Sequence, residues 1–315
     1  MALLSIVVPC YNEEATVEIF YAHAAAVCGG LPDLEVEYLF VDDGSTDGTL
    51  ALLRALGSRE RGVRWLSLSR NFGKEAALYA GLEHARGDLV AVMDVDLQDP
   101  PELLPQLLEA VRTGGYDCAA VRRVDRKGEP PIRSWFARQF YRVINRMSRT
   151  EIVDGARDFR LMTRQMVDAI LRVGEYNRFS KGIFSWVGFR VKWVEMENAE
   201  RSGGESKWSF FKLLVYALDG IIAFSTAPLA IASVLGLILC AVSFLAIVFV
   251  IIRQLVWGGS AFGWPSLVCI ILFLAGIQLF CIGILGQYLA KTYLEVKKRP
   301  IYILREQGGD PDEKP

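Results

Sequence analysis

The sequence predicts an α/β domain, a mostly parallel sheet flanked by helices, followed by interfacial amphipathic helices and a two-helix transmembrane anchor. Three observations predict this fold class. Short β-branched segments alternate with helix-length amphipathic segments over residues 1–121, which is typical of a parallel sheet covered by helices on both faces. A basic stretch with aromatic residues comes next, and two long runs without charged residues follow it.

Five short segments are rich in apolar and β-branched residues, which predicts buried strands. They are Ser5–Pro9, Val36–Val41, Val63–Leu68, Leu89–Met93 and Asp117–Val121. The apolar N-terminus lacks a basic region, so it is interpreted as the start of the first strand and not as a signal peptide. Ligands of parallel sheets bind beyond the carboxyl ends of the strands. The residues that follow each strand are therefore candidates for the functional site.

A strongly basic segment follows the predicted sheet. Residues 122–149 contain nine Arg or Lys against two acidic residues, a local charge of +7, whereas the whole chain has a net charge of −1. Arginines recur at helical spacing at Arg138, Arg142, Arg146 and Arg149. We predict an amphipathic helix at about 131–149 that lies on an anionic membrane surface. The alternative is a solvated charged helix of the globular domain.

Two long apolar runs, Ala227–Ile252 and Ser266–Ala290, contain no charged residue. Each is long enough to cross about 30 Å of hydrocarbon, so we predict two transmembrane helices. The loop between them, 253–265, carries a single charge, whereas Lys residues flank the outer ends of the pair. The positive-inside rule then predicts a hairpin with both termini in the cytoplasm.

The resulting domain organisation has six parts. They are a cytoplasmic domain at 1–206, a juxtamembrane amphipathic helix at 207–226, transmembrane helices at 227–252 and 266–290, a short external loop at 253–265 and a cytoplasmic tail at 291–315. From Gln307 onward the tail is polar and contains Gly and Pro, which predicts disorder.

The strongest chemical signal is the run Asp94-Val95-Asp96-Leu97-Gln98-Asp99, which follows a continuous apolar strand. Two carboxylates two residues apart at a strand end can turn toward one hard divalent cation, and a nucleoside diphosphate can supply further oxygen ligands. The alternative for Asp94 and Asp96 is capping or solvation. Asp99 precedes two prolines and Glu102, which predicts a helix N-cap.

Two weaker signals follow other predicted strands. Asp42 ends the second strand, where a carboxylate can accept the imide proton of a uracil or a ribose hydroxyl, although Asp-Gly-Ser is also ordinary turn chemistry. After the first strand, Tyr11 offers an aromatic face for a base, and Asn12 and Glu13 offer polar groups for a ribose. Three such sites at the strand ends of one sheet converge on one crevice.

Several other chemistries find little support in the sequence. Both histidines, His23 and His84, lie in predicted helices, which argues against a zinc site or a Ser-His-Asp triad. The six cysteines contain no C-x-x-C pair, which argues against a disulfide framework. No P-loop motif is present, and no nucleic-acid partner is expected.

Five motifs, in their order, resemble glycosyltransferase family 2, whose members have an A-type fold. They are Pro9-x-Tyr11-Asn12-Glu13, Val41-Asp42-Asp43-Gly44-Ser45-x-Asp47, Arg70-Asn71-Phe72-Gly73-Lys74, Asp94-x-Asp96-Leu97-Gln98-Asp99-Pro100-Pro101 and Asp158-Phe159-Arg160-Leu161-Met162. Phe179–Gly188, the run Glu200-Arg201-x-x-Gly204-Glu205-Ser206-Lys207 and the two apolar runs resemble the polyprenyl-phosphate glycosyltransferase branch, which is bactoprenol glucosyltransferase-like and related to dolichol-phosphate mannose synthase. Arg157 departs from the pattern, because related sequences often carry glycine there.

The resemblance implies a role for each motif residue. The nucleotide contacts would come from Pro9, Tyr11, Asn12, Glu13, Asp42, Asp43, Lys74 and Asp94. A divalent metal, Mg²⁺ or Mn²⁺, would be held by Asp94, Asp96 and Gln98. The catalytic residues would be Asp158, near the sugar and the acceptor, and Asp96. The lipid phosphate would be bound by Arg122, Arg138 and Lys207.

The implied reaction is inverting transfer of a hexose, glucose from UDP-glucose, to a polyprenyl phosphate such as undecaprenyl phosphate. A phosphate monoester has a second pKa of about 6 and is already anionic at neutral pH, so a strong general base is unnecessary. Asp158 is therefore expected to orient the reactants, while a role as base stays open. In-line attack opposite the diphosphate of an α-linked donor would give a β-linked product.

Three alternatives to this reaction differ in the sequence features that they need. The donor could be another sugar nucleotide, such as UDP-GlcNAc, UDP-galactose, GDP-mannose or a UDP-aminoarabinose type. A processive polysaccharide synthase would carry a Gln-x-x-Arg-Trp motif, which the sequence lacks. A non-catalytic sugar-nucleotide-binding membrane scaffold would not need both Asp94 and Asp96. The expected setting is a bacterial inner (plasma) membrane, and the expected assembly is a homo-oligomer such as a tetramer.

Overall fold

The computed structural model of the protein describes residues 1–31, 33–124, 152–196, 225–257 and 263–309, together with positions 139, 142, 145, 146 and 222. Most of the predicted basic helix at 131–149, including Arg138, lies outside the described residues. The same holds for most of the predicted juxtamembrane helix at 207–226, including Lys207.

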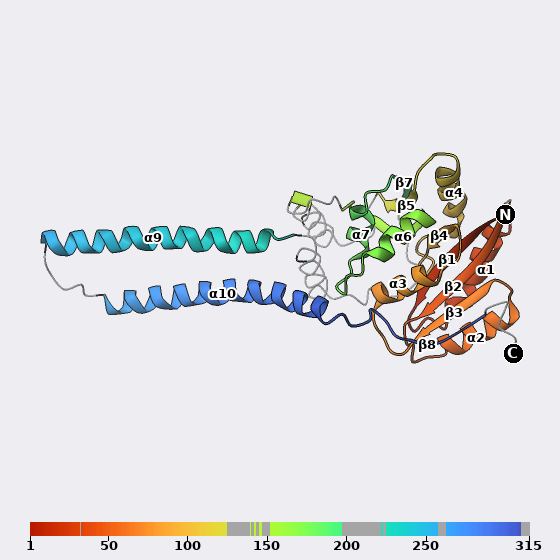
Figure 1. The fold of residues 1–315 in the computed structure, drawn as a ribbon, viewed down its shortest axis with the longest axis horizontal. Helices are drawn as coiled ribbons and strands as arrows, with labels where there is room; N and C mark the ends of the chain where they lie inside the picture. Colours follow the sequence, from red (N-terminus) through yellow and green to blue (C-terminus); the bar gives the residue numbers. More distant parts are fainter. Residues whose placement is uncertain are drawn as a thin grey trace.

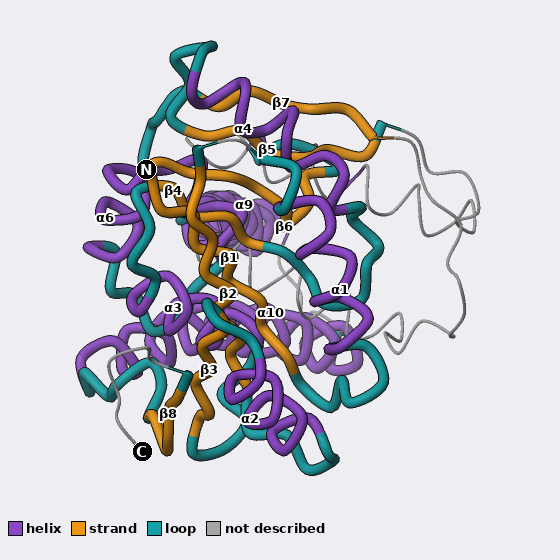
Figure 2. Tube along the Cα trace, turned by 90° about the vertical axis from the view of Figure 1, so that its right-hand side faces the viewer, coloured by secondary structure: helices purple, strands orange, loops and turns teal. Residues whose placement is uncertain are grey.

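An eight-stranded sheet lies at the centre of the globular part, in the order β7-β5-β6-β4-β1-β2-β3-β8 (Figure 1, Figure 2). Its strands are β1 (Ala2–Cys10), β2 (Leu34–Asp42), β3 (Val63–Leu68), β4 (Leu89–Val92), β5 (Cys118–Arg123), β6 (Ala156–Thr163), β7 (Val191–Met196) and β8 (Leu304–Gly308). The first five confirm the predicted strands with small shifts at their ends. The last three were not predicted from the sequence pattern.

Two kinds of pairing divide this sheet. β4, β1, β2 and β3 are parallel neighbours, which confirms the predicted parallel centre. β6 runs antiparallel between β4 and β5, and Arg160 of β6 pairs with Val92 at the end of β4. The beginning of β6 therefore lies at the edge where the parallel strands end, which is where ligands of such sheets bind.

Helices cover both faces of the sheet. One face carries α1 (Val17–Cys28), α2 (Thr49–Arg59), the short 3-10 helix η1 (Pro101–Leu103) and α4 (Leu104–Arg112), and the other carries α3 (Lys74–His84), α6 (Arg164–Arg172) and α7 (Ser180–Trp186). Successive side chains of a strand point to opposite faces. In β1, Ile6 and Val8 accordingly join one hydrophobic core, and Val7 joins the other.

Helix α3 packs closely against the central strand β1 at Gly81. A Cβ atom added at Gly81 would lie 2.2 Å from Cγ1 of Val7. Only glycine fits between the helix and the strand at this distance, because any side chain would collide with the valine. The contact seats α3 firmly on the sheet, with Lys74 as its first residue.

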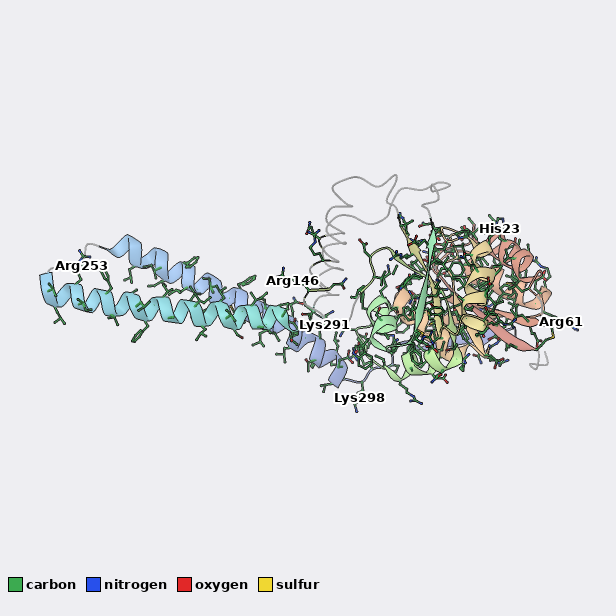
Figure 3. All side chains as sticks on the ribbon, turned by 90° about the horizontal axis from the view of Figure 1, so that it is seen from above. His23, Arg61, Arg146, Arg253, Lys291 and Lys298 are labelled. Carbon is green, nitrogen blue, oxygen red and sulfur yellow. The ribbon has the colours of Figure 1, made fainter. Side chains whose placement is uncertain are left out.

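Two long helices, α9 (Ala227–Trp257) and α10 (Trp264–Val296), project side by side from the globular part (Figure 1, Figure 3). Both are long and apolar enough to cross a membrane, over Ala227–Ala246 and Phe273–Val296, and no part of these windows is buried in the protein. The helices extend past the predicted spans at 227–252 and 266–290. The crossing of a membrane by these two helices stays a prediction.

After α10 the chain returns to the globular part and forms β8 (Figure 1). β8 pairs antiparallel with the edge strand β3, and Glu306 forms an ion pair with Arg54 at 2.5 Å. The prediction of disorder from Gln307 onward is therefore wrong for Gln307 and Gly308. An edge strand offers unpaired backbone N–H and C=O groups, and the polar composition of the tail does not reveal that such a partner exists.

Candidate active site

Two acidic side chains and one lysine meet at the carboxyl edge of the sheet. Asp94 lies just after β4, Asp158 lies near the start of β6, and Lys74 begins α3. Nζ of Lys74 is 2.7 Å from Oδ1 of Asp94 and 2.5 Å from Oδ2 of Asp158. The antiparallel placement of β6 beside β4 is what brings the two carboxylates to one ammonium.

The charges in this cluster shift one another's pKa values. Burial raises the pKa of Asp94, and the nearby Asp158 and Asp96 raise it further against the lowering effect of Lys74. Burial also disfavours the charge of Asp158, but Lys74 and Lys181 hold its pKa well below the usual range. Burial disfavours the charge of Lys74 as well, yet the two carboxylates keep its pKa above the usual value. Lys74 is therefore a stable ammonium group.

Asp43 fixes the loop that presents Lys74. Its buried carboxylate accepts hydrogen bonds from the backbone N–H groups of Phe72 at 2.7 Å and Gly73 at 2.9 Å. Gly73 has a φ of +97°, a conformation that glycine adopts without steric cost. Burial raises the pKa of Asp43, and the two N–H groups lower it. Asp43 therefore acts on Lys74 through the backbone.

Asp42 is fully buried at the end of β2. Its Oδ1 accepts a hydrogen bond from the backbone N–H of Ser45 at 3.0 Å, and its Oδ2 accepts one from the hydroxyl of Ser67 at 2.8 Å. Both oxygens thus have partners within the protein. Asp42 joins the turn after β2 to the neighbouring strand β3, and its predicted contact with the nucleotide stays a prediction.

The loop after β1 is fastened to the loop after β2. Oδ1 of Asn12 accepts a hydrogen bond from the N–H of Thr46 at 2.9 Å, and the N–H of Asn12 donates to Oγ of Ser45 at 3.0 Å. The N–H of Glu13 donates to Oγ1 of Thr49 at 2.8 Å. These bonds hold the two predicted nucleotide-binding loops together as one surface.

Tyr11 projects from this joined surface and is 45% exposed. It follows the end of β1, where Pro9 pairs in register with Val41 of β2. The exposed ring offers a flat apolar face at the edge of the sheet, which suits stacking against a base. The predicted roles of Pro9 and Tyr11 in nucleotide binding stay predictions.

The turn after Asp94 presents Asp96 to solvent. Oδ1 of Asp96 accepts a hydrogen bond from the N–H of Gln98 at 3.2 Å, and Leu97 between them has a φ of +55°. Among the described residues, no hydrogen bond reaches the second carboxylate oxygen of Asp96. The predicted metal ligands Asp94, Asp96 and Gln98 therefore lie on one short turn.

The prediction that Asp99 caps a helix is wrong. The short helix η1 begins at Pro101 without a side-chain cap. Oδ1 of the buried Asp99 instead forms an ion pair with Nε of Arg157 at 2.7 Å, and Nη2 of Arg157 donates to Oε1 of Gln98 at 3.4 Å. A charged partner on β6 competes successfully with the helix N-terminus, and the local sequence does not reveal it.

The donor atoms near Asp94 suit a divalent cation only in part. Asp94, Asp96 and Gln98 offer hard oxygen atoms, which Mg²⁺ and Mn²⁺ prefer, and the ammonium of Lys74 already occupies a cation position on Asp94. No group of three or more His, Cys, Asp or Glu side chains that could hold a metal ion occurs among the described residues. A bound cation would therefore need further oxygen ligands, such as those of a diphosphate.

The sequence model of glycosyl transferase family 2 matches residues 5–171, more than half of the chain. The chain belongs to this family. The SfII prophage-derived bactoprenol glucosyl transferase of Shigella flexneri is 44% identical over 309 residues, which cover 98% of this chain and 99% of the relative. The prophage bactoprenol glucosyl transferase homolog of Escherichia coli K12 is 43% identical over 302 residues, covering 96% and 98% of the two chains.

The fold of this family 2 transferase is shared with a solved structure. Mannosyl-3-phosphoglycerate synthase from Rubrobacter xylanophilus has a TM-score of 0.50 and 21% sequence identity, and the match covers 70% of this chain and 73% of that chain. At this identity the likeness shows the fold alone. It agrees with the predicted A-type glycosyltransferase fold.

Behind Lys74, the transferase contains a second cluster that sequence reasoning missed. Oε2 of Glu75 accepts hydrogen bonds from both the backbone N–H, at 3.0 Å, and the hydroxyl of Ser180. The guanidinium of Arg160 stacks on the ring of Phe184 at 3.6 Å. The first contact attaches α7 to α3, and the second attaches α7 to β6. The sequence offered one signal for this cluster, namely that Glu75 directly follows Lys74.

The loop that leads into α7 also contacts α10. The carboxylate of Glu295, in the last turn of α10, accepts hydrogen bonds from the N–H groups of Tyr176 at 2.9 Å and Asn177 at 3.1 Å. A cavity of about 700 Å³ lies beside this contact and is lined by Tyr79 and Tyr302 among others. The cavity is therefore at the junction with α10 and not at the Asp94–Lys74 cluster.

One of the predicted lipid-phosphate residues lies in the described part of this family 2 protein. Arg122 is near the end of β5 and pairs in register with Ala156, two residues before Asp158. Its Nη2 forms an ion pair with Oε1 of Glu195 at 2.5 Å. Arg122 thus lies on the strand next to the one that carries Asp158, whereas Arg138 and Lys207 lie outside the described residues.

Proposed function

We propose that this glycosyltransferase carries out an inverting transfer of glucose from UDP-glucose to a polyprenyl phosphate at the cytoplasmic face of a bacterial plasma membrane. The observation that carries the proposal is the cluster of Asp94, Asp158 and Lys74 at the carboxyl edge of the sheet. The substrate class comes from relatives at 43% and 44% identity over nearly their whole length, which bear the name bactoprenol glucosyl transferase.

Asp94, Asp96 and Gln98 would hold the divalent cation, Mg²⁺ or Mn²⁺, together with the donor diphosphate. When bound, the cation supplies positive charge to the departing diphosphate. The joined loops after β1 and β2 would hold the nucleoside, with the exposed ring of Tyr11 against the base. Lys74 would contribute a second positive charge to the diphosphate.

The transfer itself needs little proton chemistry from the protein. An oxygen of the acceptor phosphate attacks the anomeric carbon, the bond from that carbon to the diphosphate oxygen breaks, and the electron pair leaves with UDP. The acceptor is already anionic at neutral pH. The depressed pKa of Asp158 makes it a poor proton acceptor, so it suits the orientation of the reactants better than general-base catalysis.

The helices α9 and α10 would anchor the enzyme in the bilayer. In Figure 3, Arg253 lies at the far end of the helix pair, and Lys291 and Lys298 lie near the globular part. The concentration of Lys and Arg at the domain end supports a cytoplasmic catalytic domain by the positive-inside rule. The basic segment at 122–149, which contains Arg122 and Arg138, would bind the acceptor phosphate together with Lys207.

A transfer assay tests the proposal. Membranes that contain the protein are incubated with a short polyprenyl phosphate and, separately, with labelled UDP-glucose, UDP-GlcNAc, UDP-galactose and GDP-mannose. We expect the glucose label to enter the lipid phase, EDTA to abolish the transfer and Mg²⁺ or Mn²⁺ to restore it. Entry of a different label would reassign the donor sugar.

Matched variants test the residues in the same assay. Asp96→Asn should lower the transfer rate by about 10²-fold or more, which is the usual cost of losing one electrostatic contact to the transition state. Asp168→Asn is the control, because Asp168 lies exposed on α6 and its ion pair with Arg164 is long, at 3.9 Å. A parental rate for Asp96→Asn would contradict the catalytic metal site.

A further inference from the structure

Lys74 occupies a position that a metal ion would also need. Its Nζ lies 2.7 Å from Oδ1 and 3.0 Å from Oδ2 of Asp94, and 2.5 Å from Oδ2 of Asp158. Asp94 is one of the carboxylates proposed above as a metal ligand. The ammonium therefore contacts both oxygens of a side chain that the metal has to bind.

Charge balance explains why the ammonium lies there. The side chains of Asp94 and Asp158 are only 22% and 19% exposed, and carboxylates that share one site repel each other. The nearby Arg157 is bound to Asp99 instead. In the described part of the chain, Lys74 is thus the cation that contacts both Asp94 and Asp158.

We propose that Lys74 is an internal counter-ion that competes with the divalent cation for Asp94, so that the metal binds firmly only when the donor diphosphate arrives and accepts the ammonium. This inference rests on the proposed metal site and deepens it. Two cations about 3 Å from one carboxylate repel each other strongly, so a metal on Asp94 displaces the ammonium. A diphosphate suits the displaced group, since lysine binds phosphate as a compact point charge.

The structure allows the side chain to move while its helix stays in place. The side chain of Lys74 is 49% exposed and has a flexible four-carbon stem. The backbone is held from both sides, because Asp43 binds the two preceding N–H groups and Gly81 seats α3 against β1. The ammonium can therefore exchange Asp94 for a bound diphosphate by rotation of the side chain alone.

This exchange makes the metal and the diphosphate cooperative ligands. When the metal binds alone, it has to break the ion pair between Lys74 and Asp94. When the diphosphate binds alone, the negative carboxylate of Asp96 repels it. When both bind, each removes the obstacle to the other. By linkage, UDP strengthens metal binding by the same factor as the metal strengthens UDP binding, and such couplings are typically about 5- to 150-fold.

Metal binding measures this competition without any turnover. Mn²⁺ is titrated into the purified full-length protein in detergent and followed by electron paramagnetic resonance, with and without saturating UDP and with the signal of free Mn²⁺–UDP subtracted. Lys74→Gln should bind Mn²⁺ alone about tenfold more tightly than the parent, within the usual range of such couplings. The further gain on adding UDP should be smaller than in the parent.

Three other variants separate displacement from other effects. Lys74→Arg keeps the positive charge and should bind Mn²⁺ alone like the parent. Lys74→Met provides a second neutral side chain, and thermal unfolding shows which neutral variant is folded. Lys181→Gln removes a positive charge that acts on Asp158, whereas the contacts to Asp94 come from Lys74. It should therefore change the Mn²⁺ affinity by less than about twofold, because a more distant charge acts less strongly on the metal ligand.

Two results would overturn the counter-ion role. One is unchanged or weaker binding of Mn²⁺ alone by the folded neutral variants of Lys74, and the other is an equal gain for Lys181→Gln. Asp96→Asn tests the proposed function separately, because it should lose Mn²⁺ binding with and without UDP. Parental Mn²⁺ binding by Asp96→Asn would instead show that the metal site itself is wrong.

Discussion

The carboxylates at the carboxyl edge of the sheet fall into two groups with different partners. Asp42 and Asp43, at the end of β2, accept all of their hydrogen bonds described above from backbone N–H groups and one serine hydroxyl. Asp94 and Asp158, from β4 and β6, share the ammonium of Lys74. The first group is bound to donors that cannot leave while the loops stay folded. The second is bound to a cation on a flexible stem.

Aspartate thus serves two purposes at one edge of the sheet. A buried carboxylate whose two oxygens already accept hydrogen bonds from backbone N–H groups stabilises a loop and has little capacity left to bind a ligand. A carboxylate neutralised by a movable side chain keeps its site ready for an incoming cation. We therefore expect substitutions of Asp42 and Asp43 to lower stability and substitutions of Asp94 and Asp158 to lower activity.

The largest expected effect comes from Asp94→Asn. Loss of the ligand charge should lower kcat/KM by about 10²- to 10³-fold, the usual range for losing one preorganised electrostatic contact. The thermal midpoint should change little, because the asparagine can stay hydrogen-bonded beside Lys74. Steady-state transfer assays and thermal unfolding in detergent measure both quantities. Activity within threefold of the parent would remove Asp94 from the reaction.

Asp43→Ala should affect stability first and activity through Lys74. The substitution leaves the N–H groups of Phe72 and Gly73 without their charged acceptor, a loss of about 3 kcal/mol for two such bonds. The midpoint of thermal unfolding should fall by about 6–12 °C. Asp43→Asn, which retains one acceptor oxygen, is the control and should fall between this variant and the parent. A parental midpoint for Asp43→Ala would show that Asp43 does not stabilise the loop before α3.

Glu295→Ala tests whether the junction with α10 influences the site. Glu295 accepts hydrogen bonds from two backbone N–H groups of the loop before α7. The first residue of α7 is in turn hydrogen-bonded to Glu75, which is next to Lys74. The free energy of unfolding should fall by only about 1 kcal/mol, because the carboxylate of Glu295 is exposed. The value of kcat/KM should fall several-fold, because α7 loses part of its support. Glu109→Ala, at an exposed position of α4, is the control for an ordinary helical glutamate. Equal kinetics for the two variants would show that the junction does not influence the site.

The smallest effect is expected for Ser67→Ala. It removes one hydrogen bond to Asp42, about 1 kcal/mol, and should lower the thermal midpoint by about 2–4 °C. Transfer activity should equal that of the parent, because Ser67 is buried in β3 away from Asp94 and Lys74. A clear loss of activity in a folded Ser67→Ala protein would mean that Asp42 takes part in catalysis.

Local sequence patterns predicted the parallel centre of the sheet. The strands β1 to β5 are short apolar runs whose pattern is visible within a few residues, and the acidic pair Asp94 and Asp96 stands out because it follows such a run. β6 and β7 were missed, because strands on the mixed side of a sheet depend on neighbours far away in the chain. β8 was missed because its polar residues pair through the backbone with β3.

Local patterns were sufficient for the first five strands, the acids at their ends and the two long apolar helices, since each depends on residues close together in the chain. The tertiary structure alone decided that Asp158 shares Lys74 with Asp94 and that Asp99 pairs with Arg157. These partners are 84 and 58 positions apart, and they meet because β6 runs antiparallel to β4. Electrostatic pairing over such separations depends on strand order and direction, which no local pattern contains.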